Sequence, residues 1–517
     1  MHRCLMISEI ILNIANEIEV NYERNEPWNT LAKLARTCRV FSEPALNSLW
    51  RVQSSLEHLL RTMPEDLWWT DVDVLRPRRP IKPTDWSRFQ TYASRIHHFI
   101  CDELWDDSPS HECLQALVCA KPPNIVSFFP HLHSLGWSGL VKPSDEVFQG
   151  MPFFMSAATK KISFSLEGLR VTGLSLVQSM LYNFPELRHV DIQLPDTLAH
   201  TEADDALAEL FSYGQHLCGV KVGGVLPQPI IKHLAGFQNL KRLEVELDDR
   251  SLPARLSGFH ALEDLRVVSK TFRITSRLIP MLRSPLDTAF FITLGSVVKP
   301  QELANTFELM SLHCSHAHLR KLTVQTLLPL PQFPGAPMDH SVLQHLFVFS
   351  NLSHVELQVD APTSFDNAAM REMASAWPQL AHLTLGTCGW FRKTLITPAG
   401  LIPLLCLPRL TTISICIDAS AVDTASQHVA PQPPGGALRS LDLQFSIIND
   451  AGLMAVFLSK FAPNLEHIWS WTENATRPEV VSRELAQEYR SRWKEVARLV
   501  PLFAAVREEE RGARASS

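Results

Sequence analysis

The densest set of side chains able to hold a metal is the segment His313-Cys314-Ser315-His316-Ala317-His318. Imidazole and thiolate groups are the usual ligands of zinc, but a zinc site normally takes further ligands from a second element. The sequence offers no matching Cys/His pair, so we interpret this segment as a polar loop ahead of a strand that starts at Leu319. A zinc enzyme stays as an alternative, and elemental analysis of the purified protein tests it.

Other catalytic patterns are missing from the sequence. It contains no Gly-x-x-x-x-Gly-Lys-Ser/Thr phosphate loop and no dinucleotide glycine fingerprint. The segment Gly136-Trp137-Ser138-Gly139 lacks the first spacing of a Gly-x-Ser-x-Gly nucleophile elbow. The 10 cysteines include no Cys-x-x-Cys pair and are interpreted as reduced structural thiols. A Cys/His nucleophilic pair has no positive support, so we predict a protein that is not an enzyme, with no catalytic residue, no metal and no cofactor.

Composition narrows the classes of partner. The chain has 48 Lys and Arg against 54 Asp and Glu, a net charge of −6, which excludes a strongly basic nucleic-acid binder. No run of about 18 uncharged apolar residues is present, as a membrane helix would need. The first 18 residues are interrupted by Glu9, Asn13 and Glu17, so they lack the apolar core of a signal peptide. We therefore expect a cytoplasmic or nuclear protein that binds neither nucleic acid nor membranes.

Helical periodicity marks the first 51 residues. Ile7, Ile10, Ile11, Ile14 and Ile18 fall on one stripe of an amphipathic helix. A second helix is expected from Leu31, and a third with Ser42 as its N-cap and Pro44 in its first turn. Periodicity alone favours a helical cap on a larger domain, although a core of this size also benefits from a partner surface.

The same segment resembles an F-box. Ile7–Ile11 is similar to the opening of that motif, Leu31–Phe41 to its second helix, and Phe41–Arg51 to its close in fungal F-box proteins with large C-terminal domains. Ser8 stands where the family usually has proline. The resemblance implies docking onto a Skp-type adaptor, and through it a cullin, in a ubiquitin ligase. The residues it implies for the helical module and its adaptor contact are Ile7, Ser8, Glu9, Ile10, Ile11, Leu31, Leu34 and Trp50.

A short phrase, Leu-x-x-Leu-x-Leu, recurs over the rest of the chain. One clear copy is Leu240-Lys241-Arg242-Leu243-Glu244-Val245, and the copies start about 28 residues apart on average. Further clear copies start at Leu187, Leu262, Leu319, Leu352, Leu380, Leu410, Leu438 and Leu465, and weaker copies, which are included in that average, start at Ile96, Leu132, Thr159, Leu217 and Leu286. The alternating half of the phrase predicts a short strand, and the remaining residues must return the chain through apolar helical stretches. One such unit cannot bury its own apolar face, whereas stacked units can.

The predicted fold is therefore α/β: an F-box-like three-helix module followed by a chain that resembles a leucine-rich-repeat solenoid, with parallel strands on the concave side and helices on the convex side. The expected boundaries are 1–55 for the helical module, 56–95 for a helical connector and 96–478 for the solenoid. Residues 479–517 are expected to form a capping helix and a frayed tail beginning at Arg507.

The residues that alternate with the apolar strand positions should face the concave surface, and their mixed charge favours a protein ligand. Trp469 and Trp471 are both expected on this surface. The candidate target-binding residues are Arg242, Glu244, Glu246, Lys321, His354, Glu356, His382, Asp442, Trp469 and Trp471. The resulting hypothesis is a substrate-recognition subunit of a Skp–cullin–F-box type ubiquitin ligase. The alternative is a leucine-rich-repeat scaffold or inhibitor without a ligase role, whose N-terminal helices are only a cap.

Overall fold

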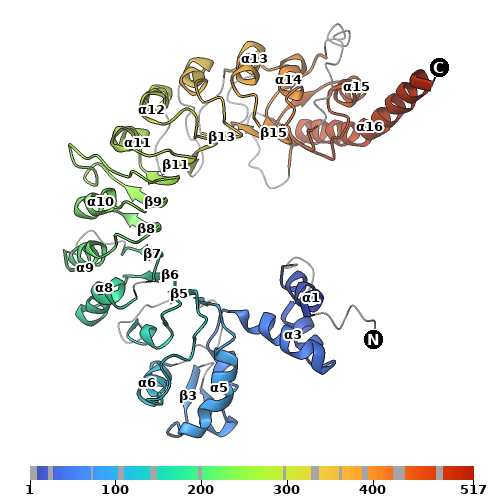
Figure 1. The fold of residues 1–517 in the computed structure, drawn as a ribbon. Helices are drawn as coiled ribbons and strands as arrows, with labels where there is room; N and C mark the ends of the chain where they lie inside the picture. Colours follow the sequence, from blue (N-terminus) through green and yellow to red (C-terminus); the bar gives the residue numbers. More distant parts are fainter. Residues whose placement is uncertain are drawn as a thin grey trace. The chain divides into compact units, whose positions relative to one another are not determined.

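The structure is a computed structural model that describes residues 8–20, 27–71, 74–102, 110–139, 148–184, 186–195, 201–294, 299–327, 337–359, 364–386, 394–422, 437–472 and 481–516. The chain forms two compact units, Met1–Asn239 and Leu240–Ser517. Both units consist of parallel strands that alternate along the chain with helices (Figure 1). The predicted α/β class with a parallel sheet is thereby confirmed. No helix in the described ranges is long and apolar enough to cross a bilayer.

The first unit begins with α1 (Ser8–Val20), α2 (Pro27–Ala35) and α3 (Arg39–Arg51), here called the N-terminal helices. Their shared core contains Ile11, Leu31 and Ala45, which are fully buried. The prediction that Ser42 caps the third helix is wrong. The Ser42 amide already donates to the Cys38 carbonyl, 3.1 Å away, so the helical ladder is running at that point and Pro44 lies inside α3.

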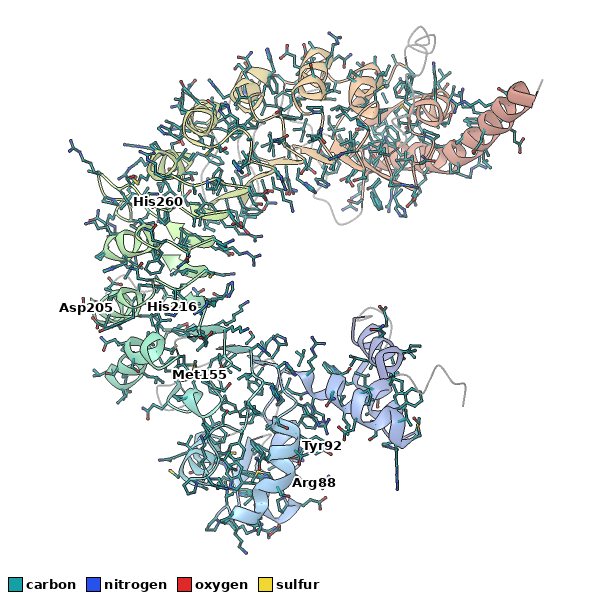
Figure 2. The ribbon with its side chains drawn as sticks, in the orientation of Figure 1. Arg88, Tyr92, Met155, Asp205, His216 and His260 are labelled. Carbon is teal, nitrogen blue, oxygen red and sulfur yellow. The ribbon has the colours of Figure 1, made fainter. Side chains whose placement is uncertain are left out.

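The N-terminal helices continue directly into the sheet of the first unit. The strand β1 (Val52–Gln53) follows α3 and pairs in parallel with β4 (His98–Asp102), so pairing already starts within the segment 1–55 that was assigned to the helical module. The end of α3 also contacts the region of α5 (Trp86–Ala93). The Trp50 ring packs against Tyr92, which Figure 2 labels on α5, with ring centroids 4.7 Å apart and the ring planes tilted by 31°. Arg95 pairs with Glu43 at 2.8 Å.

The strands β1, β4, β5 (Ser134–Gly139), β6 (Lys161–Ser165), β7 (His189–Gln193) and β8 (Gly219–Val225) pair in parallel, each with the next. A separate antiparallel hairpin joins β2 (Trp68–Asp71) to β3 (Val74–Pro77). The remaining helices of this unit are α4 (Glu57–Leu60), α6 (His111–Cys119), α8 (Val171–Asn183), α9 (Thr201–Ser212) and α10 (Gln228–Ala235), with short 3₁₀ helices η2 (Glu65–Leu67), η3 (Pro83–Asp85) and η4 (Met151–Phe153).

The second unit repeats the pattern. Its parallel strands, in order, are β9 (Arg242–Leu247), β10 (Asp264–Ser269), β11 (Thr288–Leu294), β12 (Lys321–Leu327), β13 (His354–Gln358), β14 (His382–Leu385), β15 (Thr412–Ile415), β17 (Ser440–Asp442) and β19 (His467–Trp469). A small second sheet pairs β16 (Asp418–Ala419) with β18 (Ile447–Ile448). The helices are α11 (Phe272–Leu278), α12 (Pro300–His313), α13 (Asn367–Ala376), α14 (Pro398–Leu405), α15 (Ala451–Phe461) and α16 (Arg483–Ser516), with η5 (Ile279–Met281) and η6 (His340–Leu346).

Alternating side chains explain how each strand sits in its unit. In β9, Leu243, Val245 and Leu247 are buried, and the residues between them are half-buried or exposed. Figure 1 shows α11, α12, α13 and α14 on one side of the strands of the second unit. The apolar side chains therefore pack beneath the helices, and the other face of the strands carries the polar ones.

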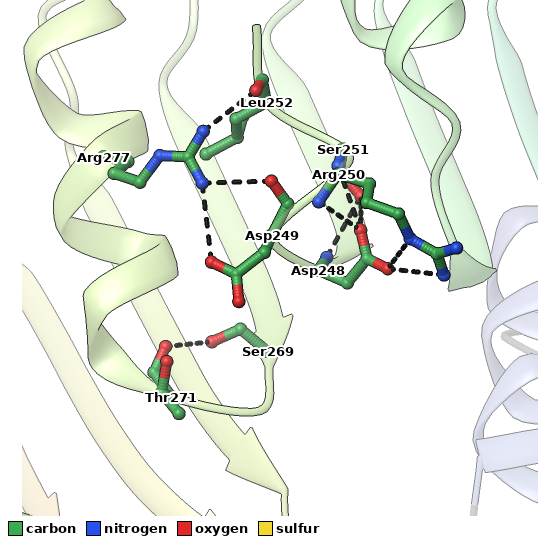
Figure 3. Close-up of polar contacts among 8 residues, drawn as sticks. All are labelled: Asp248, Asp249, Arg250, Ser251, Leu252, Ser269, Thr271 and Arg277. Carbon is green, nitrogen blue, oxygen red and sulfur yellow. Dashed lines mark hydrogen bonds and ion pairs between the residues drawn. The ribbon is translucent and has the colours of Figure 1, made fainter. Parts of the chain in front are cut away.

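The loop that follows β9 shows how the return segments are held (Figure 3). The Asp248 carboxylate accepts hydrogen bonds from the backbone amides of Arg250 at 2.8 Å and Ser251 at 3.0 Å. Arg277, on α11, donates to the carbonyls of Asp249 and Leu252, both at 3.0 Å. The loop is thereby tied to the helix of the following repeat, which fixes the spacing between neighbours.

The last helix covers the end of the second unit. The Ser446 carbonyl accepts hydrogen bonds from the indoles of Trp471 and Trp493, each 2.9 Å away, and Trp493 belongs to α16. The tail expected to fray from Arg507 is instead helical to Ser516. Arg507 explains part of the difference, because its guanidinium donates to Ser459 Oγ at 3.2 Å and to the Val456 carbonyl at 3.3 Å.

Candidate functional site

Strand register arranges the polar face of the second unit in rows. Glu356, Thr384, Ser414 and Asp442 are direct neighbours on β13, β14, β15 and β17. Trp469 on β19 extends this row by one strand. The row that precedes it by two residues contains Lys321, His354, His382, Thr412, Ser440 and His467. Because each repeat places the same phrase position at the same height, polar residues that are about 30 positions apart in sequence become neighbours.

A hollow of about 470 Å³ lies on this face, over β13 to β19. It is called the terminal hollow here. Its lining residues are Glu356, Gln358, His382, Thr384, Thr412, Ser414, Ser440, Asp442, Gln444, Phe445, Trp469, Trp471 and Thr472.

Gln444 holds the floor of the terminal hollow in place. Its backbone takes a φ of 46°, which is uncommon for a residue other than glycine. From this turn its side-chain amide donates to the Gly386 carbonyl at 2.5 Å and to Ser414 Oγ at 3.1 Å. The Ser414 hydroxyl in turn donates to Asp442 Oδ2 at 2.9 Å, and the backbone amide of Gln444 donates to Asp442 Oδ1 at 2.9 Å. The Asp442 carboxylate is therefore oriented before any ligand arrives.

Glu356 is oriented in the same way at the other end of the row. Its carboxylate accepts hydrogen bonds from the side-chain amides of Gln358 and, at 3.4 Å, Gln325. Each carboxylate oxygen has more than one lone pair, so both Glu356 and Asp442 keep acceptor capacity for a ligand.

The two tryptophans expected on this face behave differently. Trp469 is 45% exposed and stacks on His467 with ring centroids 5.2 Å apart. Trp471 is only 5% exposed, so its indole is not open on this face as expected, although the residue still lines the terminal hollow. The strand ends at Trp469, and a φ of 52° at Trp471 turns its indole inward against Phe445 and Tyr489.

The histidines of the preceding row form a stacked pair. His354 and His382 have ring centroids 6.0 Å apart. Burial lowers the pKa of His354, and the positive charges of Lys321 and a protonated His382 lower it further. His354 is therefore held towards its neutral form.

The structure brings together part of the predicted target-binding set. Glu356, His382, Asp442, Trp469 and Trp471 line the terminal hollow, with Lys321 and His354 on β12 and β13 beside it. Arg242, Glu244 and Glu246 lie apart on β9, with β10 to β12 between them and β13. Sequence reasoning missed Thr412 and Ser414, although the Leu410 copy of the repeat phrase marks their strand, and it missed Phe445 and Thr472.

The residues implied in adaptor contact fall into separate groups. Ile7 lies outside the described residues, as do the side chains of Ser8 and Glu9, whose backbone belongs to α1. Ile11 and Leu31 are buried in the core of the N-terminal helices and are not available at the surface. Ile10, Leu34 and Trp50 are half-buried. Among the side chains of these helices that the structure describes, the exposed large apolar ones are Leu12 at 45% and Trp28 at 37%.

The segment from His313 to His318 makes local contacts. His316 Nε2 lies 2.7 Å from the Ser311 carbonyl, and His318 Nδ1 lies 2.7 Å from Ser315 Oγ. Within the part of the chain that the structure describes, no group of three or more His, Cys, Asp or Glu residues could hold a metal ion.

No protein-family model matches this chain. No curated protein is significantly similar to it either. Among solved structures, a chain in the complex of Rad7 and Elc1 from yeast is 11% identical to this protein, with a TM-score of 0.33. The match covers 66% of this chain and 83% of the other chain. A chain in the complex of Toll and Spatzle from Drosophila is 14% identical, with a TM-score of 0.30. The match covers 77% of this chain and 47% of the other chain. Similarities this weak carry no argument about function.

Proposed function

We propose that this protein is the substrate-recognition subunit of a Skp–cullin–F-box type ubiquitin ligase. The N-terminal helices act as an F-box and bind a Skp-type adaptor. The strands and helices that follow form a leucine-rich-repeat solenoid, and its polar face binds the target protein. Catalysis belongs to the partners, and this chain contributes proximity by raising the effective concentration of the target near the ubiquitin-charged enzyme.

The observation that carries the proposal is the polar face of the second unit. From β13 to β17, the apolar strand residues are buried, while polar side chains such as Glu356, Ser414 and Asp442 stand in register between them. Burial of the core does not require the polar hydrogen bonds of Gln444, Ser414 and Asp442. A surface oriented in this way is suited to recognition.

The N-terminal helices support the adaptor half of the proposal. Leu12 on α1 and Trp28 on α2 are exposed apolar side chains on a small helical module, and tryptophan is enriched among the residues that dominate binding interfaces. The module is also held to its neighbours through Trp50, Tyr92 and Arg95. An adaptor bound there is therefore connected to the sheet of the first unit without a flexible linker between α3 and β1.

Retention of a purified Skp-type adaptor by the immobilised full chain tests this proposal. We expect retention at micromolar concentration, and loss of it in Leu12→Asp, because a charge would be placed at the contact. Leu312→Asp is the matched control, since Leu312 is 69% exposed on α12, outside the N-terminal helices. If the wild-type chain fails to retain the adaptor, the ligase role is wrong and a scaffold or inhibitor remains. Equal loss in both variants would also contradict the proposed contact.

A further inference from the structure

We infer that the terminal hollow binds an extended basic segment of the target, with two cationic side chains four positions apart, one for Glu356 and one for Asp442. This inference rests on the proposed function, because it specifies the chemistry of the target that the polar face receives.

Charge is the first argument. The terminal hollow contains the carboxylates of Glu356 and Asp442, and none of the lining residues that the structure describes is Lys or Arg. Both carboxylates are half-buried and held by hydrogen bonds from neutral donors, so neither is neutralised by an ion pair there. A cationic ligand gains charge-assisted hydrogen bonds at these positions. A phosphorylated or nucleic-acid ligand would meet two like charges.

Spacing is the second argument. Glu356 and Asp442 are separated by three strand-to-strand steps, through Thr384 and Ser414. Neighbouring strands are about 4.8 Å apart, so the two carboxylates are about 14 Å apart along the row. An extended chain advances about 3.4 Å per residue, and four residues therefore cover about the same distance. A peptide crossing the strands can place one cationic side chain at each carboxylate without bending.

The shape of the row is the third argument. Thr384 and Ser414, the two residues between the carboxylates, both line the terminal hollow, but Thr384 is only 5% exposed, so an occupant contacts the carboxylates more than these two residues. Beyond Asp442 in the row lies Trp469, whose indole stacks on His467 and is still 45% exposed, so a cation bound at Asp442 can meet the other face of the ring. An arginine or lysine over a tryptophan ring is attracted by the ring quadrupole, and Arg does this more often. The structure therefore favours an arginine at the Asp442 end.

The test is fluorescence anisotropy with the full-length protein and a labelled peptide, Gly-Arg-Ser-Gly-Ser-Arg-Gly. We expect this peptide to bind, and to bind more weakly as salt is raised. The same peptide with both arginines replaced by glutamate should not bind. A peptide with its two arginines adjacent should bind about tenfold more weakly, because one charged hydrogen-bonded contact is lost. Equal binding of the glutamate peptide would overturn the inference, and equal binding of the adjacent-arginine peptide would overturn the spacing.

Variants of the protein test whether the peptide binds at the terminal hollow. Glu356→Gln and Asp442→Asn keep side-chain size and are each expected to weaken binding about tenfold. Trp469→Ala should weaken it less, and Glu372→Gln, an exposed carboxylate on α13, is the matched control and should bind as wild type does. Thermal melting checks that each variant is folded. If Glu356→Gln, Asp442→Asn and Trp469→Ala all bind normally while folded, the terminal hollow is not the site. Adaptor retention separates the two proposals, because it should be unchanged in all of these variants.

Discussion

Replacing Trp493 should reveal how strongly α16 stabilises the second unit. Trp493 is 2% exposed, and its indole nitrogen donates to the Ser446 carbonyl at 2.9 Å. Trp493→Phe removes this hydrogen bond but retains most of the ring, so we expect a loss of about 1 kcal/mol in the free energy of unfolding. Trp493→Ala also removes the packed ring and should cost about 4 kcal/mol. The difference between the free-energy losses of the two variants gives the contribution of ring packing, and the loss in Trp493→Phe gives that of the hydrogen bond.

Because the repeats are stacked, the destabilisation caused by replacing Trp493 should be confined to the neighbouring repeats. In stacked repeats each unit depends mainly on its neighbours, so a loosened α16 should expose α15 and β17 before it affects β9. Hydrogen exchange followed by mass spectrometry measures this order directly. We expect Trp493→Ala to accelerate exchange in peptides covering residues 440–470 and to leave residues 242–294 near wild-type rates. Urea unfolding gives the free energies.

The reasoning fails if Trp493→Ala unfolds at the same urea concentration as wild type, because a buried indole would then contribute nothing. Leu502→Ala is the matched control, since Leu502 lies on the same helix and is 54% exposed. It should change stability by less than about 0.5 kcal/mol. Uniform acceleration over the whole second unit would contradict the nearest-neighbour account.

Two further predictions concern the first unit. Trp50→Ala should destabilise it by about 1.5 kcal/mol rather than the larger loss of a fully buried ring, because Trp50 is half-buried and packs at a tilt against Tyr92; a melting temperature equal to wild type would refute this. Burial is the main cause that lowers the pKa of His97 and His98, and His133 and Arg51 lower it further. The folded state therefore binds these protons less readily than the unfolded chain, whose histidines have a pKa of about 6.5. The free energy of unfolding should therefore be highest above about pH 6.5 and should decrease as the pH falls below this value, because the two histidines then take up protons more readily in the unfolded chain. Urea unfolding at pH 7.5 and pH 5.5 measures this loss, and the double variant His97→Gln, His98→Gln should lose less than wild type; an equal loss would contradict the assignment.

Local sequence was enough to place the strands. Leu243, Val245 and Leu247 alternate with polar residues, and a strand with one buried face is the simplest structure that satisfies this pattern. The same alternation predicted that Glu356 and Asp442 face away from the core, because each strand repeats the same phase. The helices were harder to delimit. α3 begins before its proline because the backbone ladder from Cys38 onward is already favourable, and this depends on packing rather than on cap residues.

The terminal hollow could not be predicted from periodicity, because it depends on two turns. Gln444 and Trp471 both take positive φ values just after their strands end. The turn at Gln444 lets its side-chain amide donate to the carbonyl of Gly386, 58 positions earlier in the sequence. The turn at Trp471 buries an indole that strand alternation would leave exposed. Neither residue type favours that backbone region, so nothing in the local sequence signals either turn.

Side-chain volume, more than charge, distinguishes the terminal hollow from the rest of the polar face. Charged residues recur along the same row, and Arg266 on β10 is one of them. There, however, the guanidinium lies over the Phe290 ring on β11, 5.2 Å from its centroid, and the two large side chains fill the space above the strands. Between Glu356 and Asp442 the row holds only Thr384 and Ser414. Thr384 is only 5% exposed and Ser414 accepts a hydrogen bond from the Gln444 side chain, so a ligand on this face meets the two carboxylates rather than the residues between them.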